Sequence, residues 1–129
     1  MSTDQRTFAA ALVDVVLVAL FVLIGRASHR EPIGAAEFLG TFWPFAVGLA
    51  AGWLALRAWR APFAIGRTGL PLWPITVALG MLLRLVSGQG VTWPFVVVAT
   101  IVLGAFLLGW RVLLEALDRR STRPSVRRR

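Results

Sequence analysis

Four long apolar stretches restrict the fold of this chain more than any other feature of its sequence. They are residues 8–25, 38–56, 70–86 and 91–114. A helix needs about 20 residues to cross the hydrocarbon core of a bilayer. Backbone polar groups at that depth have no water partner, so segments of this length must be helical. The sequence therefore predicts an all-α, polytopic membrane protein built as a bundle of four transmembrane helices.

The alternative to a membrane bundle is a soluble four-helix bundle, and the composition speaks against it. Such a bundle requires a polar face on every helix. Segments 15–22 and 96–103 contain almost no polar residue, and the whole chain is 57% apolar and only 16% charged. A bilayer is therefore the predicted solvent for the four helices.

The arginines predict how the chain lies in the membrane. With four spans both termini share one side, and that side receives eleven of the fourteen basic residues. Basic residues next to short loops stay in the cytoplasm. We therefore expect a multi-pass protein of the plasma membrane, with residues 1–114 as its transmembrane domain and both termini cytoplasmic.

Residues 115–129 are expected to form a basic cytoplasmic tail. Arg111, Glu115 and Arg119 are spaced four residues apart, which predicts that the last helix continues beyond the membrane with exposed ion pairs. The tail carries no aromatic residues between its arginines, so base stacking is absent and nucleic acid is not the expected partner. Anionic lipid headgroups, at about 1 kcal/mol per basic residue near the surface, are the expected partner of this tail.

Two local patterns predict where helices begin and how they pack. The pairs Trp43-Pro44, Trp73-Pro74 and Trp93-Pro94 each fall near the start of a span, which places each proline in a first helical turn. Gly48 and Gly52 form a small-residue strip suited to close helix packing, for which packing within one chain is favoured over dimerisation.

Asp14 is the most informative polar residue, because it lies about 9 Å into the first apolar stretch at 1.5 Å per residue. Three interpretations remain open. Asp14 forms a structural ion pair with Arg111 or Arg57, binds a proton or cation, or lies close enough to the headgroups to be hydrated. The structural pair is favoured because arginines are present at a similar depth.

The third and fourth spans carry polar or small stripes. Thr76 and Arg84 lie on one face of the third span, and Thr100 and Arg111 lie on one face of the fourth. Such stripes more often line helix contacts than a solute pathway. Together with Asp14, these residues are the candidate intramembrane polar site. Arg84 lies near the outer surface, where it either snorkels or pairs with an acid of the first outer loop.

That outer loop contains a second candidate cluster, formed by Arg26, His29 and Glu31. A metal site is not predicted here, because a single histidine and scattered acids give too few ligands. The sequence also contains no phosphate loop, nucleophile elbow or pair of intramembrane carboxylates. We therefore expect a protein that is not an enzyme and needs no cofactor.

Several short motifs in order along the chain resemble those of a known family. They are Asp14-Val-Val, Ile24-Gly25-Arg26-x-Ser28-His29, Trp43-Pro44-Phe45-x-x-Gly48, Gly80-Met81-x-x-Arg84 and Gly109-Trp110-Arg111. As a set they resemble the domain of unknown function 3054 family of small prokaryotic membrane proteins. The resemblance implies a four-span fold but no substrate. It nominates for testing Asp14, Arg26, His29, Arg84 and Arg111.

Three hypotheses for function follow. The favoured one is an accessory or interaction protein, packed in the membrane beside copies of itself or a larger complex. The second is a small proton-coupled transporter that acts as an oligomer through Asp14. The third is lipid or quinone binding between helices, motivated by arginines at both surfaces and an apolar interior.

Overall fold

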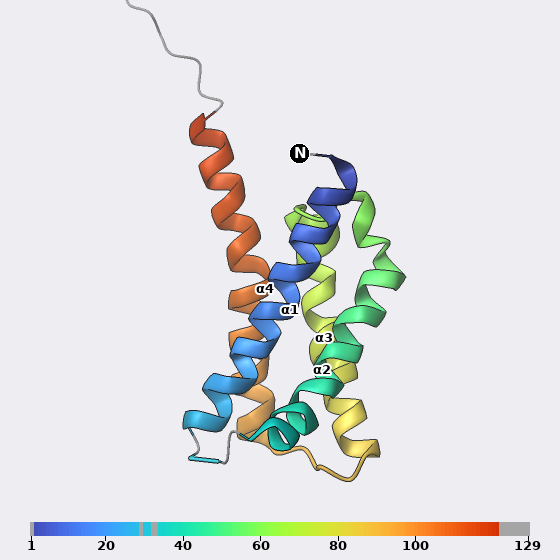
Figure 1. Cartoon of the computed structure of the whole chain (residues 1–129), viewed down its shortest axis with the longest axis vertical. Coiled ribbons are helices and arrows are strands. Elements are labelled where there is room, and N and C mark those ends of the chain that lie inside the picture. The colour runs from blue at the N-terminus through green and yellow to red at the C-terminus, as the bar shows by residue number, and fades with distance from the viewer. Residues whose placement is uncertain (1, 29, 32–33, 122–129) are drawn as a thin grey trace, which may run out of the picture.

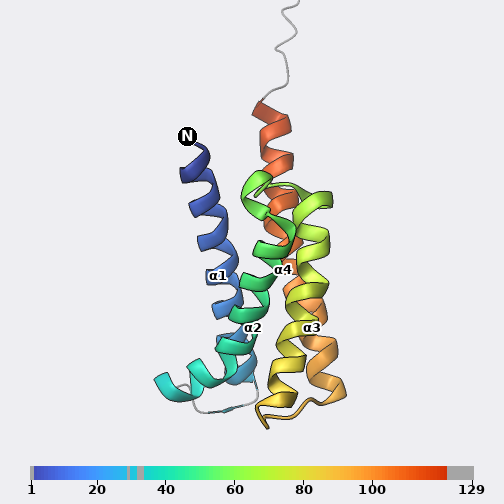
Figure 2. The same cartoon turned by 90° about the vertical axis from the view of Figure 1, so that its right-hand side faces the viewer.

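The computed structural model of the chain describes residues 2–28, 30–31 and 34–121, where all regular structure is helical. The four long helices are α1 (Thr3–Ser28), α2 (Ala35–Leu56), α3 (Leu70–Val86) and α4 (Trp93–Ser121). Figures 1 and 2 show that they run up and down as one bundle. All four are long and apolar enough to cross a membrane when the turn before α3 is counted with it. The predicted all-α, four-helix membrane fold is confirmed.

The helices extend beyond the apolar stretches at four of their eight ends. Helix α1 begins five residues before Phe8, and α4 continues as far as Ser121. Helix α3 coincides with the expected span 70–86, whereas α4 begins at Trp93, two residues later than expected. The start of α1 and the end of α4 lie at the same end of the bundle (Figure 1).

The outer surface of the bundle is apolar, as hydrocarbon requires. Leu54 is 69% exposed, Ile101 64% and Leu113 61%. The removal of apolar side chains from water therefore does not drive these helices together. Close packing and internal polar contacts have to hold the bundle together.

Glycines bring α2 and α3 into close contact. A Cβ on Gly48 would lie 2.9 Å from the Thr76 carbonyl oxygen, and one on Gly52 would lie 2.6 Å from a methyl group of Leu72. A Cβ on Gly80 would collide with the Phe45 ring. The predicted use of Gly48 and Gly52 for packing within the chain matches these contacts.

The expectation that all three Trp-Pro pairs open a helix was wrong for two of them. Pro94 does lie in the first turn of α4, but Pro44 and Pro74 lie inside α2 and α3. Proline lacks an N–H, so Pro44 leaves the carbonyl of Gly40, four residues earlier, without its helical donor. Gln89 donates its Nε2 to that carbonyl at 2.9 Å. A side chain from another segment thus satisfies the freed group, as membrane helices require.

Candidate functional site

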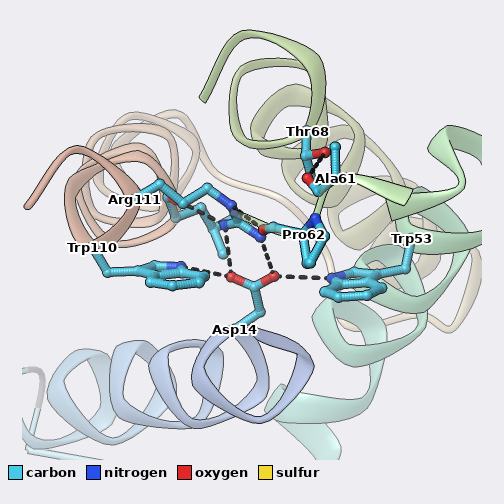
Figure 3. A network of polar contacts seen from close by, with 8 residues as sticks. Asp14, Trp53, Ala61, Pro62, Thr68, Trp110 and Arg111 are labelled. Carbon is cyan, nitrogen blue, oxygen red and sulfur yellow. Dashed lines mark hydrogen bonds and ion pairs between the residues drawn. The ribbon is translucent and has the colours of Figure 1, made fainter. Parts of the chain in front are cut away.

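Asp14 is completely buried inside the bundle, where four hydrogen bonds reach its carboxylate (Figure 3). Its Oδ1 accepts from Arg111 Nη1 at 2.8 Å and from the Trp110 indole at 2.9 Å. Its Oδ2 accepts from Arg111 Nη2 at 2.8 Å and from the Trp53 indole at 2.9 Å. The neighbouring turn of α1 presents Ala10, which is also fully buried and small enough to allow this approach.

Arg111 is the matching cation, and it is also completely buried. Besides Asp14, its guanidinium donates from Nε to the Pro62 carbonyl at 3.1 Å and from Nη1 to the Leu107 carbonyl at 2.9 Å. Four of its five N–H groups are therefore used. The guanidinium carbon also lies 4.5 Å from the centre of the Trp110 ring. Planar, two-pronged pairing of this kind is the strongest form of arginine–carboxylate contact.

The connection between α2 and α3 covers the pair. Helix α2 ends at Leu56, and the next residue, Arg57, has a left-handed backbone (φ 50°) that turns the chain back over the bundle. The Thr68 hydroxyl then closes the connection by donating to the Ala61 carbonyl at 2.6 Å (Figure 3). Gly69 leaves room for the arginine, because a Cβ there would lie 2.9 Å from Arg111 Cδ.

The geometry defines what this site does chemically. A carboxylate offers about four acceptor positions, and all four on Asp14 are occupied. A proton or a cation would have to displace one of these donors. The network instead joins α1 to α2, to α4 and to the α2–α3 connection, so we describe it as a structural clamp. Of the two arginines expected as partners, the structure pairs Asp14 with Arg111.

The other candidates for the intramembrane polar site lie elsewhere. The Thr100 hydroxyl donates to the Val96 carbonyl at 2.7 Å, and its own carbonyl accepts from the Trp73 indole at 2.7 Å. The Thr76 hydroxyl is buried against α2 without a hydrogen-bond partner in the described part of the chain. Arg84 lies at the opposite end of the bundle from Asp14. The stripes on α3 and α4 therefore line helix contacts rather than one shared polar site.

The outer-loop cluster is partly assembled. Arg26 Nη1 lies 3.3 Å from Glu31 Oε2 and donates to the Thr41 hydroxyl at 2.8 Å. His29 lies outside the described residues. Within residues 2–28, 30–31 and 34–121, no group of three or more metal-ligating side chains occurs.

The expected ion pairs along the end of α4 need one correction. Glu115 pairs with Arg119 at 2.6 Å, as the spacing predicted. Arg111, however, turns inward to Asp14 instead of pairing with Glu115, because its Cα lies on the core side of α4. The last helical turns are thus exposed only beyond Arg111.

Sequence reasoning missed the two indoles that complete the clamp. Tryptophan was expected at the bilayer boundary, yet Trp53 and Trp110 point into the bundle toward Asp14. Their depth gave no signal, because Trp53 lies three residues before the end of α2 and Trp110 lies four residues before the end of the expected span 91–114. The usable signal is that a buried indole N–H needs an acceptor, and Asp14 is the acid available inside the first span.

The fold and this clamp define a class: a four-helix integral membrane bundle held by a buried arginine–aspartate pair. A family model described as "Protein of unknown function (DUF3054)" matches residues 11–114, so the chain belongs to that family. The match includes both Asp14 and Arg111. No curated protein and no solved structure matches the chain.

Proposed function

We propose that this chain is a non-enzymatic interaction protein that receives a transmembrane helix of another chain in a groove between α3 and α4. The groove has a volume of about 770 Å³ and runs along α3 from the turn before it to Met81. Its lining residues are Gly66, Leu70, Pro71, Trp73, Pro74, Val77, Ala78, Met81, Val96 and Thr100. This groove is the observation that carries the proposal.

The lining suits a helix better than a polar ligand. It contains no charged residue, and the Thr100 hydroxyl is already bound to Val96. Pro74 and Ala78 are small and exposed one turn apart on α3, which lets a neighbouring backbone approach closely. An apolar helix with small residues facing Ala78 would fill the groove.

The groove can be tested with a photo-crosslinking amino acid. The residue would replace Ala78 in the groove or, as a matched control, Ala105, which is exposed on α4 outside the groove. We expect position 78 to form one defined protein adduct in native membranes, either with a second copy or with one partner of constant mass. Position 105 should not form it, and Ala78→Trp should abolish it when the crosslinker is placed at Met81. Adducts with lipid alone at position 78 would refute the proposal.

We also propose that the end of the bundle holding the two termini faces the cytoplasm across the plasma membrane. The support is the distribution of arginines, with Arg57, Arg60 and Arg67 all in the connection at that end. The basic tail then lies beside the anionic headgroups of the inner leaflet.

Proton-coupled transport receives no support from the site. That hypothesis depends on a carboxylate able to take up and release a proton, and all four acceptor positions of Asp14 are filled by fixed donors.

A further inference from the structure

A second set of polar side chains surrounds a cavity at the opposite end of the bundle from Asp14. The cavity has a volume of about 310 Å³, and each of the four long helices contributes to it. Its polar lining consists of Arg26, Glu31, Thr41, Arg84 and Gln89. Its apolar wall consists of Phe21, Val22, Gly25, Phe95 and Val98. One cavity thus combines a basic polar end with a hydrocarbon wall.

The charges around this cavity do not balance. Arg26 and Arg84 both line it, and Glu31 is the one acid among the described residues that line it. Glu31 pairs with Arg26 at 3.3 Å, and its side chain is 52% exposed against 13% for Arg26. Two guanidinium groups therefore face one half-solvated carboxylate, which leaves one positive charge for an anion to neutralise.

Arg84 has donors left for that anion. Its Nε donates to the Gly90 carbonyl at 3.3 Å and its Nη1 to Gln89 Oε1 at 3.1 Å. Within the described ranges, Arg84 forms no ion pair, and its Nη2 donates no hydrogen bond. The guanidinium carbon lies over the Phe95 ring, 4.4 Å from its centre, which positions the group beside the cavity. Gln89 is itself fixed to the Gly40 carbonyl, so the arrangement is preformed.

The position and the wall of the cavity point to a lipid. Arg26 and Arg84 each lie two residues before the end of their helix, and the ends of membrane-spanning helices lie near the headgroups. Val98 is 44% exposed on α4, so the apolar wall continues onto the lipid-facing surface. A Cβ on Gly25 would meet nothing within 4 Å, which shows open space beside α1. The volume is roughly ten times that of one liquid water molecule, enough for a phosphate and its glycerol.

We infer that this cavity binds a phosphate-bearing lipid, with the phosphate between Arg26 and Arg84 and the start of a hydrocarbon chain along Phe21 and Val98. Arginine binds phosphate oxygens through paired N–H groups, and basic pockets between transmembrane helices hold lipid headgroups. The Arg84 Nη2 group supplies the free donors, and Arg26 supplies the second charge. This site is separate from the α3–α4 groove, so either can fail without the other.

Native mass spectrometry of the full chain tests the inference. The purified protein would be offered equal amounts of phosphatidylglycerol and of diacylglycerol with the same acyl chains. We expect retention of one phosphatidylglycerol at least tenfold above diacylglycerol. Arg84→Gln should lower that retention at least tenfold, whereas Arg67→Gln, which removes an exposed arginine at the other end, should leave it within twofold.

A cavity-filling pair of variants tests the shape. Gly25→Leu places a side chain in the open space and should also lower retention tenfold, whereas Gly109→Leu, at an equally open helical position outside the cavity, should not. The Arg84→Gln comparison stands even if Gly25→Leu fails to fold. Equal retention of both lipids, or unchanged retention in Arg84→Gln, would overturn the inference. Displacement of the lipid by millimolar inorganic phosphate would also overturn it, because the site would then bind the free anion.

Discussion

Removing one partner of the Asp14–Arg111 pair should destabilise the bundle, and removing both should cost less than the two single losses added together. Asp14→Ala deletes four hydrogen bonds, which at about 0.6 kcal/mol each for membrane helices gives about 2.4 kcal/mol. Breaking a buried pair by removing one partner typically costs about 3–5 kcal/mol in all, because the fully buried Arg111 is left without a counter-charge as well as without these hydrogen bonds. We therefore expect a loss between about 2.4 and 5 kcal/mol for Asp14→Ala and a similar loss for Arg111→Met.

The double variant Asp14→Ala/Arg111→Met carries neither charge, so we expect it to cost at least about 1.5 kcal/mol less than the two single losses added together. The free energy of unfolding would be measured by titration with dodecyl sulfate in mixed micelles, followed by circular dichroism. Glu115→Gln breaks the exposed pair on α4 and serves as the control, with an expected change within about 0.5 kcal/mol. Additive single losses, or single losses below about 1 kcal/mol, would show that the pair does not act as a clamp.

Three smaller predictions concern other parts of the fold. Trp110→Phe removes one donor to Asp14 and should cost about 0.6–1.7 kcal/mol in the same titration, whereas Trp43→Phe at a 39% exposed ring should change little. Gly80→Ala forces a methyl group against the Phe45 ring and should cost about 1–3 kcal/mol, or shift the ring if the titration shows no loss. The chain has no native cysteine, so single cysteines can be introduced at Ser121 and at Ser87, which lie at opposite ends of the bundle. When intact cells are treated with an impermeant maleimide, only Ser87→Cys should react.

The sequence was sufficient for the number and type of the helices and for the depth of the polar residues. Hydrocarbon allows few backbone solutions, so long apolar runs translate almost directly into helices. The depth of Asp14 and of Arg111 along their helices also follows from 1.5 Å per residue. These two quantities made an ion pair between residues 97 positions apart a sensible expectation.

The rotation of each helix and the path of the connections could not be read from the sequence. An apolar helix in lipid has little amphipathic signal, so nothing in α1 indicates that Asp14 faces both Trp53 and Trp110. The carbonyl of Pro62 is a backbone group in an irregular segment, and no residue type marks it as an acceptor for Arg111. The internal positions of Pro44 and Pro74 were missed for a related reason, since a freed carbonyl can be satisfied by a distant side chain.

Arg111 and Arg84 lie in different parts of the bundle and have different roles. The difference lies in how many of each guanidinium's N–H groups already donate to fixed acceptors. Arg111 is fully buried, directs four N–H groups at fixed acceptors and has a carboxylate in bidentate contact. Such an arginine has almost no unused donor for a ligand, and its role is to hold the helices in a fixed arrangement. Arg84 is half-buried, has two hydrogen bonds to neutral groups and faces a cavity shared with another arginine. A guanidinium that is held in place but has unused donors contributes little to the stability of the fold and is well suited to binding an anion. Substitution of Arg84 should therefore lower lipid retention more than it lowers the free energy of unfolding. Substitution of Arg111 should lower the free energy of unfolding more than it lowers lipid retention.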